Sequence, residues 1–174
     1  QEEALTMSDR IAVLSRGILE QIDNPRMIYN HPASKFVADF IGESNLFYGT
    51  VNSAVGDTVS VTLETGTVMA KCPDVKVGEI VDISVRPENL LMSEAPVPGF
   101  DCPAIIKEYV FIGNIHKVIL AMPSGKEVKI NQSPKIQELP VGTKVNLYWE
   151  NEDAVVISSL DNPVFQAVDN VVYA

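Results

Sequence analysis

The chain has 174 residues, with 13 Lys and Arg against 23 Asp and Glu, so its net charge is -10. Hydrophobic residues make up 46% and charged residues 21%, a composition typical of a soluble globular protein. The acidity argues against binding nucleic acid or anionic lipid, because both need cations that neutralise phosphates. No apolar run approaches the roughly 18–20 residues that span a bilayer. We therefore expect no nucleic-acid partner and no direct membrane insertion.

The few cysteines and histidines exclude several kinds of site. Cys72 and Cys102 are too few for a disulfide framework and lack C-x-x-C spacing, so we expect small, buried, reduced residues in the cytosol. Neither His31 nor His116 has a second His or a Cys at ligand spacing. A metal centre or a hydrolytic triad is therefore poorly supported, and His116 is expected to be a polar residue on a strand face.

The first 43 residues predict a helix, a hairpin and two further short helices. Residues 2–8 have the composition of the last turns of a helix, and Arg16-Gly17 between two apolar runs predicts a two-residue hairpin turn. Asn24-Pro25 predicts a helix cap followed by the first helical residue. Apolar residues then recur at helical spacing between 36 and 41, and Gly42 is expected to end that helix.

From Leu46 onward the sequence predicts a β structure. Short β-branched runs that alternate apolar and polar residues are separated by turns rich in Gly, Pro, Asn and Asp. Clear examples are residues 58–63, 80–85, 117–120 and 145–149. Their number and spacing are typical of a small barrel or sandwich.

A weak internal repeat lies within this β region. Residues 77–85 align with residues 141–149, with Gly78 on Gly142 and apolar residues on apolar residues. The pattern favours two copies of one β unit, at about 46–94 and 100–158, and chance similarity between amphipathic strands is the alternative. Neither copy alone would bury much surface, so we expect the two to pack together.

No arrangement of residues predicts catalysis. The nearest approach to a phosphate loop, Gly125-Lys126-Glu127, lacks the upstream glycine and has a carboxylate where a hydroxyl is required. The acidic run Glu150–Asp153 is interpreted as a solvated hairpin turn between two strands, in preference to an acid/base or cation site. Trp149 and Phe111 are expected to be core residues, not a platform for nucleic-acid bases, because their neighbours are not basic.

The opening block resembles a segment of ATP-binding cassette (ABC) import ATPases. Residues 1–14, Gln-Glu-Glu-Ala-Leu-Thr-Met-Ser-Asp-Arg-Ile-Ala-Val-Leu, are similar to the stretch that follows the switch histidine of these proteins. Residues 16–25 and 36–42 continue the family pattern. Asp23 departs from it, because the family more often has Gly there.

The β region resembles the accessory C-terminal transport-associated OB-type (TOBE) domain of the same ATPases. Arg86-Pro87-Glu88 matches its Arg-Pro-Glu signature, and residues 111–113 resemble its second glycine-containing strand. The junction at residues 40–47 and the closing residues 148–156 are similar to the spermidine/putrescine branch. The motif positions, for which we expect structural roles, are Asp9, Arg10, Gly17, Pro25, Phe40, Gly42, Arg86, Pro87, Glu88, Gly113 and Trp149.

The resemblance, together with the strand pattern, implies a mainly β fold. We expect a tandem OB-type barrel or sandwich preceded by a small α/β segment of one helix, a hairpin and two short helices. Residues 1–43 would be the tail of a nucleotide-binding domain and residues 46–160 the TOBE domain, followed by a C-terminal tail at 161–174.

The resemblance also implies a function. The chain would be the regulatory and dimerisation part of an ATP-hydrolysing importer subunit that energises spermidine/putrescine uptake. The family's Walker and signature motifs and its switch histidine would precede Gln1, so no catalytic, cofactor-binding or metal residue is expected here, whereas the parent would bind ATP and Mg. Expected partners are a second copy and the permease subunits, at the cytoplasmic face of the cell membrane. The alternatives are an OB-type module that binds an oxyanion, and an importer subunit for sugar, sulfate or iron.

Overall fold

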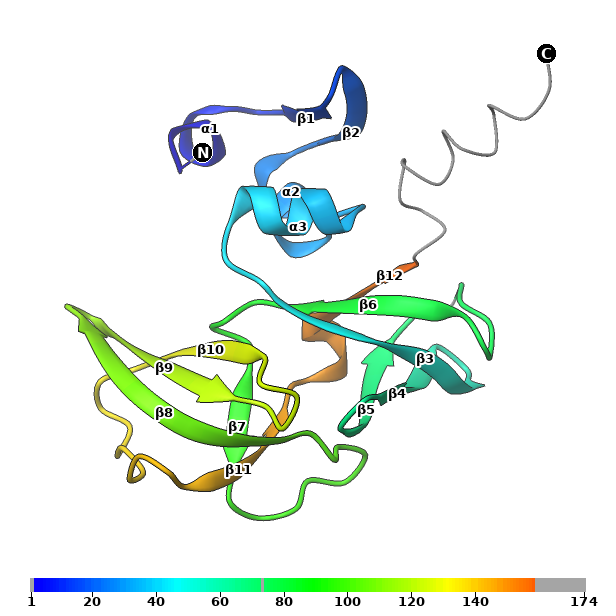
Figure 1. Cartoon of the computed structure of the whole chain (residues 1–174). Coiled ribbons are helices and arrows are strands. Elements are labelled where there is room, and N and C mark those ends of the chain that lie inside the picture. The colour runs from blue at the N-terminus through cyan, green and yellow to red at the C-terminus, as the bar shows by residue number, and fades with distance from the viewer. Residues whose placement is uncertain (1, 73, 159–174) are drawn as a thin grey trace.

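The computed structural model describes residues 2–72 and 74–158, which form two bodies stacked one above the other (Figure 1). The smaller body, here called the N-terminal block, comprises residues 2–43. Its elements are α1 (Glu2–Met7), β1 (Ile11–Ser15), β2 (Ile18–Asp23), α2 (Pro25–Asn30) and α3 (Lys35–Ile41). The helix, hairpin and two helices expected from the sequence are all present.

Local signals account for most of the N-terminal block. Arg16 and Gly17 both have positive φ, 50° and 82°, which is the backbone of a two-residue hairpin turn. The Asn24 side chain accepts a hydrogen bond from the Met27 N–H at 3.0 Å and caps α2. Gly42 does end α3, but its φ of 171° is extended and not left-handed. A Cβ there would lie 3.3 Å from Cε2 of Tyr29, so close packing accounts for this glycine.

The larger body, here called the β module, consists of two five-stranded antiparallel sheets. One sheet has the order β12-β6-β3-β4-β5, and the other has the order β10-β9-β8-β11-β7. The strands are β3 (Asn45–Val55), β4 (Thr58–Leu63), β5 (Gly66–Lys71), β6 (Ile80–Val85), β7 (Leu91–Ser93), β8 (Pro103–Ile112), β9 (Ile115–Ala121), β10 (Glu127–Gln132), β11 (Lys144–Tyr148) and β12 (Ala154–Ser158).

The two sheets have the same internal order, which is the tandem arrangement predicted from the sequence. In each, a long first strand pairs with the second and fourth strands of its own set, and the second pairs with the third. The fifth strand crosses over: β7 pairs with β11, and β12 pairs with β6. Each half therefore completes the sheet of the other, as Figure 1 shows.

Backbone hydrogen bonds repeat between the halves at matching residues. The Val51 N–H donates to the Glu79 carbonyl at 2.9 Å and the Ile106 N–H to the Thr143 carbonyl at 3.1 Å. Gly78 and Gly142 donate back to Val51 and Ile106, both at 2.8 Å. In both halves the register shifts beside this site, between Val51 and Ser53 and between Ile106 and Glu108. Such agreement in bulge position favours a true repeat over chance similarity.

One hydrophobic core lies between the sheets, and Trp149 is its largest fully buried side chain at 2% exposure. Its ring lies 5.0 Å from Phe47 and 5.1 Å from Phe100, and its Nε1–H donates to the Met69 carbonyl at 2.8 Å. The prediction for Phe111 is wrong: the side chain is 66% exposed at the tip of the β8–β9 hairpin. The tip extends past the sheet, so no facing layer covers it.

The interpretation of the acidic run Glu150–Asp153 as a hairpin turn is also wrong. It contains a single 3-10 turn, Asn151–Asp153, but the strands on either side of it do not pair with each other. β11 lies in one sheet and β12 in the other, so the turn carries the chain between sheets. Of the two free cysteines, Cys102 is buried as expected, whereas Cys72 is only partly buried. The tail predicted at residues 161–174 lies outside the described residues.

Candidate functional site

The N-terminal block and the β module have separate hydrophobic cores. Val13, Ile28, Val37 and Ile41 form the small core of the block, whereas the large cluster is confined to the β module. The contacts between them are made mainly by polar and charged side chains. We call this contact region the joint, defined by Tyr29, Glu43, Ser44, Arg86 and Glu88.

Arg86 is the centre of the joint and is only 5% exposed. Its Nε and Nη2 donate to the Tyr29 carbonyl oxygen at 3.2 and 2.8 Å. Its Nη1 donates to the carbonyls of Ala38 and Glu43 at 3.0 and 3.1 Å and to Ser44 Oγ at 2.7 Å. Tyr29 and Ala38 lie in the last turns of α2 and α3, whose carbonyls lack partners within the helix. One guanidinium therefore caps two helix ends, where a cation is favoured.

Tyr29 and Glu88 complete the contact with Arg86. The guanidinium carbon lies 4.2 Å from the centre of the Tyr29 ring, and Tyr29 Oη donates to Glu88 Oε1 at 2.7 Å. Burial, followed by the hydrogen bond to Glu88, raises the pKa of Tyr29 to about 12. Burial also lowers the pKa of Arg86. The phenol is therefore neutral at pH 7 and acts as a hydrogen-bond donor.

Glu43 joins the segment after α3 to the second sheet. Its carboxylate lies 2.6 Å from Lys117 Nζ and 3.1 Å from Lys129 Nζ, on neighbouring strands β9 and β10. Its hydrogen bond with Lys117 is the main cause of a lowered Glu43 pKa, and the hydrogen bond with Lys129 acts in the same direction. These are partly exposed ion pairs, so each contributes about 1 kcal/mol or less.

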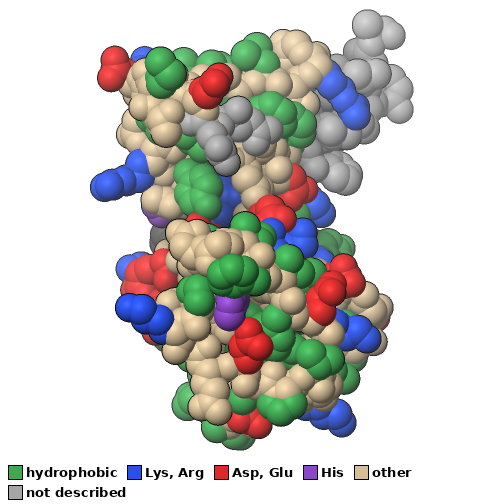
Figure 2. All heavy atoms as spheres, turned by 90° about the vertical axis from the view of Figure 1, so that its left-hand side faces the viewer, with side chains coloured by type: hydrophobic (Ala, Val, Ile, Leu, Met, Phe, Trp, Pro, Cys, Tyr) green, Lys and Arg blue, Asp and Glu red, His purple; other side chains and the backbone are tan. Residues whose placement is uncertain are grey.

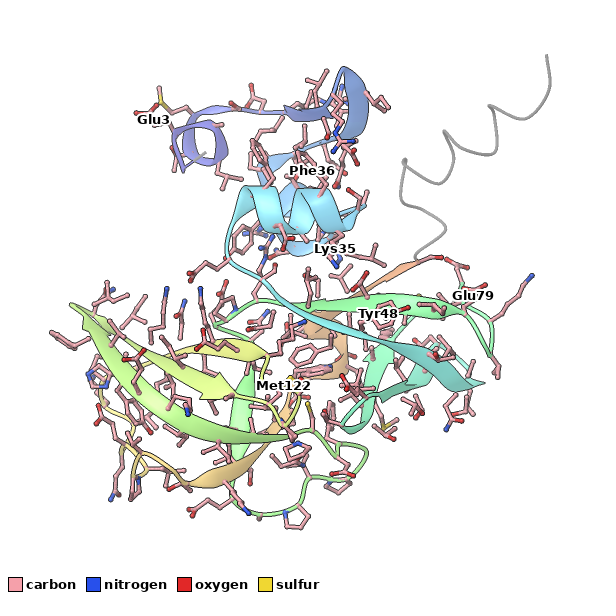
Figure 3. All side chains as sticks on the ribbon, viewed as in Figure 1. Glu3, Lys35, Phe36, Tyr48, Glu79 and Met122 are labelled. Atoms are coloured by element: carbon pink, nitrogen blue, oxygen red, sulfur yellow. The ribbon has the colours of Figure 1, made fainter. Side chains whose placement is uncertain are left out.

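Lys35 and Lys126 place further charges along the joint. Lys35 Nζ lies 3.6 Å from Asp82 Oδ1 on β6, and Figure 3 shows Lys35 at the side of α3 that faces the β module. Lys126 Nζ donates to the Leu46 carbonyl, and burial lowers the Lys126 pKa. Burial raises the pKa of Asp39, which lies near the same groups. The charges alternate in sign, which favours one orientation of the block over others.

Asn45 connects the two sheets directly below the joint. It is 5% exposed, its Nδ2 donates to the Lys129 carbonyl at 2.8 Å, and its Oδ1 accepts from the Lys129 N–H at 2.8 Å. A second donation reaches the Val85 carbonyl at 3.3 Å. The Asn131 N–H donates to the Pro87 carbonyl at 2.8 Å. These bonds therefore hold β10 of one sheet against β3, β6 and the turn after β6 of the other.

The predicted motif residues fall into three groups. Gly42, Arg86, Pro87 and Glu88 come together at the joint, and Trp149 lies in the core. The remainder are apart from both: Asp9 and Arg10 are exposed between α1 and β1, Gly17 and Gly113 occupy hairpin turns, Pro25 begins α2, and Phe40 stacks on Phe36 at 5.4 Å. His116 lies on β9 as expected, with Nδ1 2.9 Å from Glu138 Oε1.

The sequence did not single out Tyr29, Glu43 or Asn45. Asn45 had a usable signal, because it is a polar residue directly before the apolar pair Leu46-Phe47 at the start of a strand. Tyr29 and Glu43 had none, since their partners lie 59 and 74 residues away in sequence.

The joint holds the two bodies together through side-chain hydrogen bonds and ion pairs. Among residues 2–72 and 74–158, no three His, Cys, Asp or Glu side chains are grouped in a way that could hold a metal ion. Each of the three guanidinium nitrogens of Arg86 donates to at least one protein acceptor. The arrangement is suited to fixing the block against the β module.

The hairpin of the N-terminal block exposes an apolar face. Val13 points into the small core, whereas the cross-strand pair Leu14 and Leu19 is 60% and 53% exposed, and Ile22 is 46% exposed. A two-stranded ribbon with apolar residues on both faces is typical of a buried position. This face therefore has the character of a surface that more protein would cover.

Comparison with known proteins shows similarity to one family domain and to a set of longer proteins. Residues 83–157 match the TOBE domain. The chain is 35% identical over 164 residues to the spermidine/putrescine import ATP-binding protein PotA of Rubrobacter xylanophilus, and 38% identical over 160 residues to PotA of Ruegeria pomeroyi. Each alignment includes 90% of this chain and 43% of the relative.

Over most of its length this chain is therefore similar to part of the spermidine/putrescine import ATP-binding proteins. It contains a match to the TOBE domain and spans less than half of the length of the curated relatives that it matches. The alignments include far more of the chain than the 83–157 segment, in agreement with the resemblance over residues 1–43.

A solved structure supports the fold assignment of the β module. The cytoplasmic molybdate-binding protein ModG, in a crystal form with molybdate bound, matches 64% of this chain and 94% of its own chain with a TM-score of 0.54. The sequence identity is 16%, so the likeness concerns the fold alone. Within the part of the chain that the structure describes, no helix has the length and apolar character to cross a membrane.

Proposed function

We propose that this chain is the regulatory and dimerisation part of an ATP-hydrolysing ABC importer subunit that energises spermidine/putrescine uptake. The observation that carries the proposal is the similarity to PotA proteins over 90% of the chain, through both the N-terminal block and the β module. By itself the chain is proposed to be non-catalytic. The parent subunit would bind ATP and Mg and would contact permease subunits at the cytoplasmic face of the membrane.

The structure suggests how such a part would work. Residues 1–43 would be the tail of the nucleotide-binding domain, and the apolar face at Leu14 and Leu19 would pack against the rest of that domain. The joint would then transmit the domain's position to the β module, because Arg86 ties both helix ends to β6. Two β modules in contact would keep two ATPase subunits together while their catalytic domains separate.

Transport assays on the parent subunit test this proposal. The full-length protein, reconstituted with its permease in vesicles, should take up labelled spermidine or putrescine with ATP, and Arg86→Ala should reduce uptake more than it reduces binding of ATP. The 174-residue chain alone should show no ATP hydrolysis above background. Uptake of a sugar, sulfate or iron in place of polyamines would contradict the substrate.

The oxyanion-binding alternative is distinguished by calorimetry. Titration of the chain with molybdate, spermidine and ATP should give no tight binding if the β module only regulates and dimerises. Micromolar or tighter binding of molybdate would favour the alternative.

A further inference from the structure

We propose that two copies of this chain associate by inserting the β8–β9 hairpin tip of each into an open groove of the other. The tip is residues 110–115. The groove lies between β3 and β4 of the first half and the turn after β9 of the second half. This contact deepens the proposed dimerisation function and rests on it.

The tip projects as an apolar finger. The β8–β9 hairpin is longer than its counterpart in the first half. After the matching register shifts, β3 and β4 form three residue pairs, whereas β8 and β9 form five, from Glu108↔Ile119 to Ile112↔Ile115. β10 ends opposite His116, so the last pair of the hairpin has no strand beside it. Phe111 and Ile112 are 66% and 50% exposed. They occupy opposite faces of the ribbon, so both faces of the tip are apolar.

The groove is an open space of about 540 Å³, within the range of ordinary binding pockets. Its lining includes the buried apolar side chains Phe47, Leu63 and Met122. Tyr48 at its edge is 60% exposed, and Figure 3 shows Tyr48 and Met122 coming from the two different sheets. Hydroxyl groups of Thr and Ser residues complete the lining, so both apolar and backbone polar groups of a hairpin would find partners there.

The tip of one molecule cannot fill its own groove. The tip ends at Ile115, which is the first residue of β9. Met122, in the lining of the groove, directly follows Ala121, which is the last residue of β9. At about 3.3 Å per residue, a seven-residue strand separates the two by roughly 20 Å. Figure 1 shows the tip at the end of the β8–β9 ribbon that points away from β3 and β4. A second copy brings the same tip and the same groove, so reciprocal insertion closes a two-fold dimer.

The distribution of charge favours contact between the tip of one copy and the groove of the other. The chain carries a net charge of -10, so most surfaces of two copies repel each other. Residues 110–115 contain no charged side chain, and the groove contains one acid and one base, Glu64 and Lys126. Figure 2 looks onto the end of the molecule where apolar side chains gather beside histidine and acidic groups. Phe111 and His116 are paired across the β8–β9 hairpin, with ring centres 5.2 Å apart.

Sedimentation of the 174-residue chain over a range of concentrations tests the contact. The wild type should dimerise, and Phe111→Asp and Tyr48→Asp should each weaken the dimer by about tenfold or more. Both positions are exposed, so circular dichroism should show an unchanged fold. The matched control is Leu19→Asp on the apolar face of the β1–β2 hairpin, which should leave the dimerisation constant unchanged.

Disulfide trapping tests the geometry independently. In a Cys72→Ser background, a mixture of Asn114→Cys and Thr50→Cys chains should form a mixed dimer under mild oxidation, whereas Asn114→Cys with Lys144→Cys should not. A chain that dimerises but is insensitive to Phe111→Asp, or that is dissociated by Leu19→Asp instead, would overturn the tip contact and leave the proposed function standing. A chain that is monomeric at the highest concentrations would overturn both the contact and the dimerisation function.

Discussion

The turns after β6 and after β11 occupy matching places in the two halves of the β module, and they have opposite roles. Both make the same backbone bond: the Asn89 N–H donates to the Arg86 carbonyl at 3.0 Å, and the Asp153 N–H donates to the Glu150 carbonyl at 2.9 Å. Both carry the chain across to the other sheet. Arg86, however, is buried against two helix ends, whereas Glu150 is exposed. The repeat therefore specifies the backbone, and a single side chain decides where the N-terminal block docks.

The halves also differ in how their interiors are filled. Trp149 of the second half matches Val85 of the first, and its ring reaches across to Phe47 on the opposite sheet. The Trp149 side chain fills space between the sheets that would stay empty if valine stood at both matching positions, 85 and 149. The same half exposes Phe111 at its tip, so its two large aromatic residues have different surroundings.

The largest expected effect on stability tests the contrast between buried Trp149 and exposed Phe111. Trp149→Ala should lower the free energy of unfolding by about 3–5 kcal/mol, because it leaves a cavity between the sheets and an unpaired Met69 carbonyl. Phe111→Ala should change it by about 0.5 kcal/mol or less, since the side chain is exposed. Urea unfolding of both variants measures the difference. Similar losses for the two variants would contradict the placement of Phe111.

The second prediction tests the contrast between Arg86 and Glu150, which occupy matching positions in the two turns. Arg86→Ala should cost about 2–4 kcal/mol, because the carbonyls of Tyr29 and Glu43 lose their side-chain donor and that of Ala38 keeps only the longer bond from Ser44. Glu150→Ala, at the matching position, should cost about 0.5 kcal/mol or less. Limited proteolysis should cleave near residues 42–44 faster in Arg86→Ala than in the wild type. Arg86→Lys should restore only part of the loss, since an ammonium cannot reach both helix ends.

The smallest effect sharpens the role of Glu43. Because the folded state lowers the Glu43 pKa below its ordinary 4.5, the ion pairs with Lys117 and Lys129 stabilise the fold above that pH. This contribution should disappear as the pH falls through the lowered pKa. Glu43→Gln should thus cost about 1 kcal/mol or less at pH 7 and nothing in strong acid. Unfolding free energies of both proteins from pH 7 downward measure the difference, and a cost that persists in strong acid would argue against these pairs.

The sequence by itself determined the local elements and their repetition. The turn at Arg16-Gly17, the cap at Asn24 and the alignment of Gly78 with Gly142 depend on residues only a few positions apart, whose conformational preferences act whatever the rest of the chain does. The Arg-Pro-Glu motif at 86–88 was found by its resemblance to a family. The resemblance did not indicate the carbonyls of α2 and α3 to which Arg86 donates.

Only the tertiary structure decided which strands exchange between the halves and what Arg86 binds. The crossing of β7 and β12 depends on pairing between residues more than 50 positions apart, which no local pattern specifies. Phe111 and Trp149 are both aromatic residues in or directly after a strand, and only the position of the facing sheet buries one and exposes the other. Burial and long-range hydrogen bonds depend on the packing of the whole fold, because they join surfaces that local sequence does not place together.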